Sequence, residues 1–142
     1  MDWRIASIGT LPTNPLWNEK GVLRTGHATT TVIKSTDAVL LVDPSLPAQV
    51  LDARLQERWG MKLSDVTHVF VTSFDPDRRR GLEGLEHANW YMFEPEITSA
   101  ALAIGDELYR AEGDGELIEI LNEHKDLLLS FLVAEDCVLE NV

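Results

Sequence analysis

The loop Ser73–Arg78 contains the residues whose types and spacing are best suited to chemistry. It reads Ser-Phe-Asp-Pro-Asp-Arg and follows Val66–Thr72, a β-branched run that predicts a strand. The carboxylates of Asp75 and Asp77 are close enough in sequence to share a hard divalent ion such as Mg²⁺, Mn²⁺ or Ca²⁺. Arg78 stays protonated and cannot bind a cation. We therefore expect Arg78 to form a salt bridge with Asp75 or Asp77 in preference to a metal site.

Other polar residues are weaker candidates for a site. Asp43 ends the short apolar run Ala38–Val42, and functional groups of α/β proteins often lie at the carboxyl end of a strand. The three consecutive arginines Arg78–Arg80 suit a phosphate or carboxylate ligand, although an internal cluster of ion pairs is the preferred interpretation. The histidines have no metal-ligand spacing and are interpreted as ordinary surface or core residues: His27, His68, His87 and His124.

The elements that would position this loop follow from residue patterns. Helices are predicted from apolar residues three and four apart, in the segments Ala48–Trp59, Ile97–Leu108 and Leu117–Leu132. Strands are predicted for Arg4–Leu11, His27–Ser35, Ala38–Val42, Val66–Thr72 and Trp90–Phe93, and a further one is expected to begin near Cys137. This order predicts a mixed α/β fold in a single domain, 1–142, with no linker inside it.

The stretch from His27 to Glu96 resembles the first half of the metallo-β-lactamase superfamily. Ala38–Asp43 is similar to the family's strand that ends in an aspartate, Leu63–Thr72 to the strand leading into its metal loop, and Ala88–Met92 to the short strand after that loop. The family's signature is Thr-His-x-His-x-Asp-His. At its three histidine positions this chain has Ser73, Asp75 and Arg78, and only the aspartate, Asp77, is retained.

The resemblance implies an αββα sandwich with two facing sheets, of which this chain would supply only the first half, a mixed sheet with flanking helices. It also implies that the residue matching Asp77 binds the second zinc ion, and that Asp43 lies behind the metals and holds their loop. In the family, bound zinc lowers the pKa of water to roughly 7 and so provides hydroxide. Serine and arginine at ligand positions imply a degenerate site.

Three functions remain open. The preferred hypothesis is a non-catalytic protein that needs no cofactor and acts through association or ligand binding. The alternative is a metal-dependent hydrolase of esters, thioesters, amides or phosphoesters. It would hold zinc or another divalent metal on Asp75 and Asp77, with His27 or a partner chain adding ligands. The third is a truncated remnant without activity of its own.

The sequence also predicts how the protein associates and where it resides. Half of a sandwich leaves one apolar sheet face uncovered, so we expect a homodimer or a partner chain that supplies the second half. The net charge of −12 argues against nucleic acid and anionic membranes as partners. One cysteine, Cys137, and the lack of a basic and apolar leader indicate a cytoplasmic protein.

Overall fold

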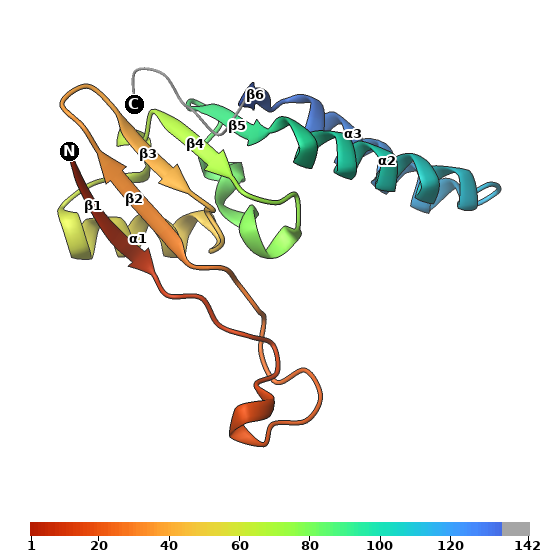
Figure 1. Ribbon diagram of the computed structural model, residues 1–142, viewed down its shortest axis with the longest axis horizontal. Coiled ribbons are helices and arrows are strands. Elements are labelled where there is room, and N and C mark those ends of the chain that lie inside the picture. Colours follow the sequence, from red (N-terminus) through yellow and green to blue (C-terminus); the bar gives the residue numbers. More distant parts are fainter. Residues whose placement is uncertain (135–142) are drawn as a thin grey trace.

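The computed structural model describes residues 1–134, which form a six-stranded mixed sheet with helices (Figure 1). The strands stand in sequence order across the sheet. The pairs β1–β2 and β2–β3 are antiparallel, and β3 to β6 run parallel to one another. Their bounds are β1 Asp2–Ser7, β2 Thr30–Lys34, β3 Val39–Val42, β4 His68–Val71, β5 Asn89–Phe93 and β6 Leu132–Ala134. The mixed α/β class predicted from the sequence is confirmed.

Three α-helices connect the parallel strands: α1 Ala48–Trp59, α2 Glu94–Arg110 and α3 Gly115–Leu129. Helix α1 follows Pro47 and ends at Gly60, which has a φ of 60° and donates its N–H to Gln56 and Leu55. This is the left-handed helix end that glycine favours. Short 3₁₀ turns at Leu63–Asp65, Pro76–Arg78 and Arg80–Gly84 complete the connections between β3, β4 and β5.

The core lies on the face of the sheet that α1 covers. Alternate strand residues point into it, and the apolar ones without any exposed surface are Val32, Leu41, Val69, Val71 and Met92. Leu51 and Leu55 of α1 pack against them and are equally buried. In the edge strand β1, the guanidinium of Arg4 lies 5.0 Å from the centre of the Trp59 ring. This cation–π contact links the end of α1 to β1.

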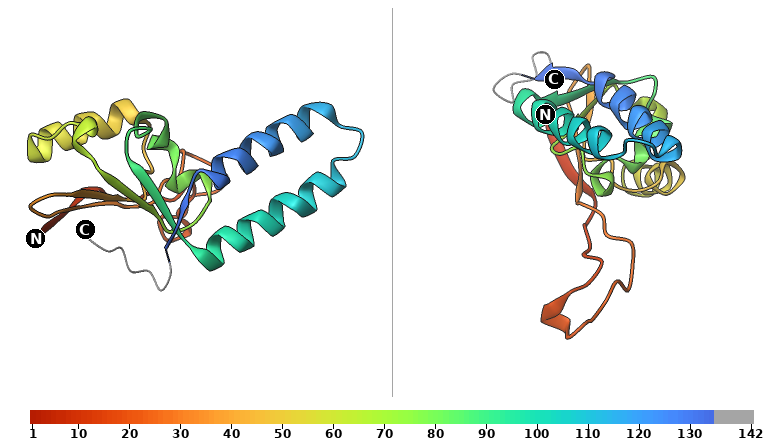
Figure 2. Two further views of the ribbon diagram at one scale, coloured as in Figure 1. Left: turned by 90° about the horizontal axis from the view of Figure 1, so that it is seen from above. Right: turned by 90° about the vertical axis from the view of Figure 1, so that its right-hand side faces the viewer.

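The opposite face of the sheet is apolar and incompletely covered. Trp3 and Ile5 of β1, paired with Ile33 and Thr31 of β2, are 65% and 42% exposed. Further along the same face, Phe70 of β4 is only half-buried. The helices of the described chain leave this face without a covering layer, as Figure 2 shows for α1 on one side and the α2–α3 pair beyond the sheet edge. An uncovered apolar sheet face was the expectation from the sequence.

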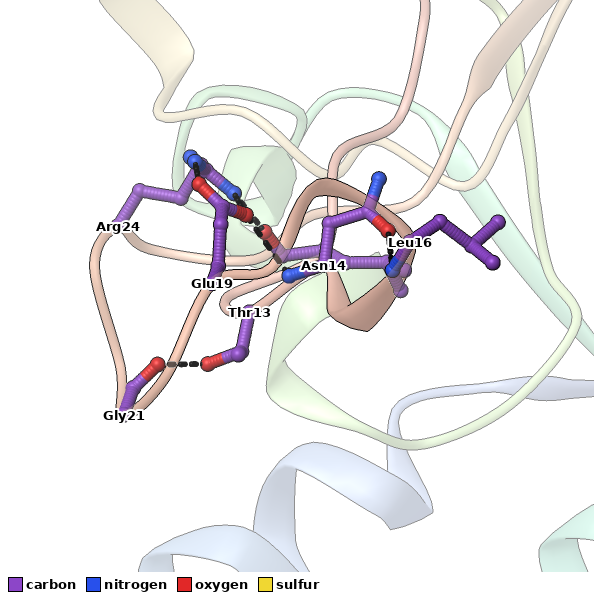
Figure 3. Close-up of polar contacts among 7 residues, drawn as sticks. Thr13, Asn14, Leu16, Glu19, Gly21 and Arg24 are labelled. Carbon is purple, nitrogen blue, oxygen red and sulfur yellow. Dashed lines mark hydrogen bonds and ion pairs between the residues drawn. The ribbon is translucent and has the colours of Figure 1, made fainter.

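Residues 8–29, between β1 and β2, form a loop that projects from the sheet (Figure 1). Its end is held by polar contacts: the Glu19 carboxylate pairs with Arg24 and accepts the N–H of Asn14 at 2.8 Å, and the Asn14 side chain accepts the N–H of Leu16 (Figure 3). The loop explains why the predicted strands Arg4–Leu11 and His27–Ser35 are both too long. The pairing of β1 with β2 shifts register between Ile5 and Ser7, and after Ser7 the chain leaves the sheet.

Helices α2 and α3 form an antiparallel hairpin that extends away from the sheet (Figure 2). Ile104 of α2 and Leu121 and Leu128 of α3 are buried, as is Ala111 directly after α2. Acidic side chains such as Glu107 and Glu123 are exposed. The helix periods predicted from the sequence are confirmed, but α2 begins already at Glu94 and the predicted third helix ends at Leu129, before β6. The strand expected near Cys137 lies outside the described residues.

No helix in residues 1–134 has both the length and the hydropathy needed to cross a membrane.

Candidate functional site

Asp43 joins the carboxyl ends of β3 and β4. It directly follows β3, with a φ of 53°, and is 7% exposed. Its carboxylate oxygens accept two hydrogen bonds from Thr72, one from the backbone N–H at 2.7 Å and one from the hydroxyl at 2.7 Å. The backbone N–H of Asp43 donates to Phe70 at 2.9 Å. The strained backbone of Asp43 is therefore held by a bridge between two neighbouring strands.

Burial is the main influence on the charge of Asp43. It raises the pKa of the carboxyl above its ordinary value, because the ionised form loses solvation. The two hydrogen bonds from Thr72 lower this pKa, as does the positive charge of Arg78, while the negative charge of Asp77 raises it. Asp43, Asp77 and Arg78 thus interact electrostatically at one end of the sheet.

Arg78 makes a contact different from the salt bridge that the sequence predicts. It ends the turn Pro76–Arg78, and its Nη1 donates to the hydroxyl of Thr72 at 3.2 Å. Within residues 1–134, it forms no ion pair with Asp75 or Asp77, so that expectation is wrong. The physical reason is the turn itself, which directs the guanidinium back toward the Thr72–Asp43 bridge.

Two polar atoms of this loop are buried without a hydrogen-bond partner: Oδ1 of Asp77 and Nε of Arg78. Such atoms are uncommon in folded proteins, since an unpaired buried polar group costs roughly 1–3 kcal/mol. The backbone of Asp77 is better satisfied, with its carbonyl accepting the N–H of Ala28 at 2.9 Å. The loop therefore contains one buried donor and one buried acceptor whose hydrogen-bonding capacity is unused.

The other two arginines bind backbone carbonyls. Arg79 donates its Nε to Phe74 at 2.7 Å, and its guanidinium lies 4.3 Å from the centre of the Phe74 ring. Arg80 donates to the carbonyl of Gly26 at 2.5 Å and so ties the loop to residues 8–29. The interpretation of Arg78–Arg80 as a cluster of ion pairs is therefore wrong; the three guanidiniums fix the path of the loop instead.

The residues present do not fit a zinc site. The hydroxyl of Ser73 accepts the N–H of Asp75 at 3.4 Å, and Arg78 adds a positive charge beside Asp43. In the part of the chain that the structure describes, no three His, Cys, Asp or Glu side chains gather closely enough to hold a metal ion. Whether Asp75 and Asp77 bind a divalent cation stays a prediction.

The histidines do not complete the loop. His68 stacks on Tyr91 in the sheet, with ring centres 6.0 Å apart, and its Nδ1 lies 2.7 Å from the hydroxyl of Thr67. The imidazole of His27 contacts the carbonyl of Ala28 and lines a separate cavity. His124 lines a cavity between the loop and the α2–α3 hairpin together with Asp75.

Sequence reasoning missed Thr72 as a residue of the site. Its hydroxyl contacts both Asp43 and Arg78 and is the link between them. The signal was present, since Thr72 immediately precedes the loop and is the first residue of the signature. The sequence has no comparable signal for the cavity that Asp75 lines with α2 and α3, because this cavity depends on where the α2–α3 hairpin packs.

Comparisons with known proteins agree with this fold. Residues 23–136 match the family model described as the metallo-beta-lactamase superfamily. Among solved structures, a metallo-beta-lactamase of Thermotoga maritima is similar with 17% identity and a TM-score of 0.60, over 94% of this chain and 57% of that one. AidC, a dizinc quorum-quenching lactonase, is similar with 18% identity and a TM-score of 0.53, over 80% of this chain and 44% of that one.

The chain thus spans little more than half the length of the Thermotoga protein. No curated protein sequence matches it.

The charge of Arg78 can be tested through the titration of Asp43. We expect Arg78→Met to raise the pKa of the Asp43 carboxyl further, because the attraction that lowers it is removed. The pKa is measured from the carboxyl ¹³C shift by NMR between pH 3 and 8. Arg54→Met, on the exposed surface of α1, is the matched control and leaves the pKa unchanged. An unchanged pKa in Arg78→Met would show that the guanidinium does not act on Asp43.

The substitution Arg78→Met also changes how the stability of the fold depends on pH. A raised pKa means that the folded protein holds this proton more tightly than the unfolded chain does. The contribution of Asp43 to stability is therefore greatest at acidic pH and falls as the pH rises through the pKa of the folded protein. In Arg78→Met we expect this fall to continue to higher pH, measured by urea unfolding at several pH values.

Proposed function

The chain belongs to the metallo-β-lactamase superfamily, and we propose that it is a non-catalytic member in which the guanidinium of Arg78 supplies the positive charge of the metal loop. The observation that carries this proposal is the contact from Arg78 to the Thr72–Asp43 bridge. A permanent cation attached to the loop interacts with Asp43 and repels a metal ion placed beside it.

An arginine can replace the charge of a metal ion, but not its chemistry. Zinc acts through open coordination positions, where it binds water and lowers its pKa. A guanidinium has only N–H donors, so it orients an anion or a carbonyl without generating hydroxide. The presence of Ser73, Asp75 and Arg78 at the positions of the ligand histidines therefore supports the proposal that this protein does not hydrolyse substrates.

The alternative is a metal-dependent hydrolase that uses Asp75 and Asp77. Its substrates would be esters, thioesters, amides or phosphoesters, and the fold alone does not select among them. The buried, unpaired Oδ1 of Asp77 is the observation in its favour. We prefer the non-catalytic function because Asp75 faces the α2–α3 hairpin and Arg78 lies beside Asp43.

We propose that the protein acts through association as well as ligand binding. The apolar sheet face that carries Trp3, Ile5 and Phe70 is the contact surface, and a second copy of the chain is the partner that we favour over a different chain. Support comes from the exposure of Trp3 and Ile5, since monomers rarely leave a large continuous apolar face in water. A two-fold dimer buries the same face on both copies.

Zinc affinity tests the proposed loss of the metal site. We expect wild-type protein to bind zinc weakly, and the triple variant Ser73→His, Asp75→His, Arg78→His to bind it at least about tenfold more tightly, because imidazoles replace a hydroxyl and a guanidinium. Affinity is measured by competition with a chromophoric chelator. The variant His87→Ala, at an exposed histidine outside the loop, serves as the control. Tight, stoichiometric zinc binding by the wild type would favour the hydrolase instead.

Sedimentation equilibrium tests the proposed association. Trp3→Lys places a charge on the open sheet face, and we expect it to raise the dissociation constant of the dimer at least about tenfold. Trp17→Lys is the matched control, because Trp17 is similarly exposed, at 69% against 65%, but lies in the projecting loop. A wild-type chain that remains monomeric at all concentrations, or an equal effect of both variants, would contradict the homodimer.

A further inference from the structure

An open cavity of about 290 Å³ lies between the loop Phe74–Arg79 and the α2–α3 hairpin. Its volume is just below the usual range for small-molecule sites, roughly 300–1,000 Å³, which suits a ligand smaller than a typical drug. The apolar part includes Ile104 and Leu121, which are 8% and 3% exposed, and the ring of Phe74. This surface can contact an aliphatic group a few carbons long.

One side of the cavity contains a guanidinium held in a fixed position. The Nε of Arg79 donates to the carbonyl of Phe74, and the guanidinium lies over the Phe74 ring, so two separate contacts determine its orientation. Burial lowers the pKa of Arg79, although the group remains protonated. In residues 1–134, Arg79 has no ion-pair partner within 4.0 Å. A guanidinium of this kind can bind a carboxylate with two parallel hydrogen bonds, although the nearby charge of Asp75 already acts on it.

The same cavity contains two carboxylates, Asp75 from the loop and Glu107 from α2, and the imidazole of His124 from α3. Both carboxylates are exposed. A simple anion would be attracted by Arg79 but repelled by Asp75 and Glu107, and a simple cation would meet the opposite problem. A ligand with one charge of each sign matches all three charged groups.

We propose that this cavity binds a free α-amino acid with an aliphatic side chain. Its carboxylate pairs with Arg79, its ammonium group with Glu107 and Asp75, and its side chain packs on Ile104 and Leu121. This inference rests on the proposed function, because it names the class of ligand that a non-catalytic protein of this fold would bind next to its former metal loop.

Calorimetric titration of the full chain with three related probes tests the proposal. L-Leucine carries both charges, L-leucinamide lacks the carboxylate, and N-acetyl-L-leucine lacks the ammonium group. We expect L-leucine to bind and each derivative to bind about ten- to a hundredfold more weakly, the effect of losing one charge-assisted hydrogen-bonding group. Absence of L-leucine binding, or equal affinity for the three probes, would overturn the proposal.

Two variants of the hairpin assign the binding to this cavity. Glu107→Gln removes one carboxylate that lines it, and Glu112→Gln makes the same change at an exposed residue outside the cavity. We expect about tenfold weaker L-leucine binding for Glu107→Gln and no change for Glu112→Gln, with equal circular dichroism spectra. An equal effect of both variants would overturn the assignment. Zinc affinity is measured separately, so failure of this proposal is distinguishable from failure of the non-catalytic function.

Discussion

The hydrogen bonds from Thr72 to the Asp43 carboxylate are the constraint on which this end of the sheet depends. They hold a buried carboxylate at the end of β3 against the end of β4, in a backbone conformation with positive φ. Donors and nearby positive charge favour the ionised form of a buried carboxylate, against the effect of burial. Thr72 supplies the donors and Arg78 supplies the charge, so the loop after β4 is held by the protein's own side chains.

The arrangement of the loop then determines what surrounds it. Because Arg78 turns back toward the sheet, Asp75 and Arg79 are left facing α2 and α3, where they line a cavity. Arg80 reaches Gly26 and anchors the base of the projecting loop 8–29. Through Arg78 and Arg80 the loop is thus connected to the end of β4 and to the loop 8–29, while Arg79 binds Phe74 within the loop itself. Exposed ion pairs in place of these contacts would hold the loop less firmly, because each exposed pair contributes little to stability.

The sequence predicted the order and type of the elements well, because buried strands such as β3 and the apolar stripe of α1 have strong periodic signals. It also located the loop and identified Ser73, Asp75 and Arg78 as unusual. It failed on the partner of Arg78 and on the limits of β1 and β2. Both depend on the path of the backbone in turns, which a residue pattern does not specify. The cavity beside His124 depends on tertiary packing and was not predictable.

The metal content of the purified protein tests the central claim most directly. Elemental mass spectrometry is performed on protein prepared without chelator and exchanged gently into metal-free buffer. If Arg78 supplies the positive charge of the loop, zinc, iron and manganese should each be near zero per chain. About one metal ion per chain would contradict this account, because a metal held in the presence of Arg78 would require Asp75 and Asp77 to act as ligands after all.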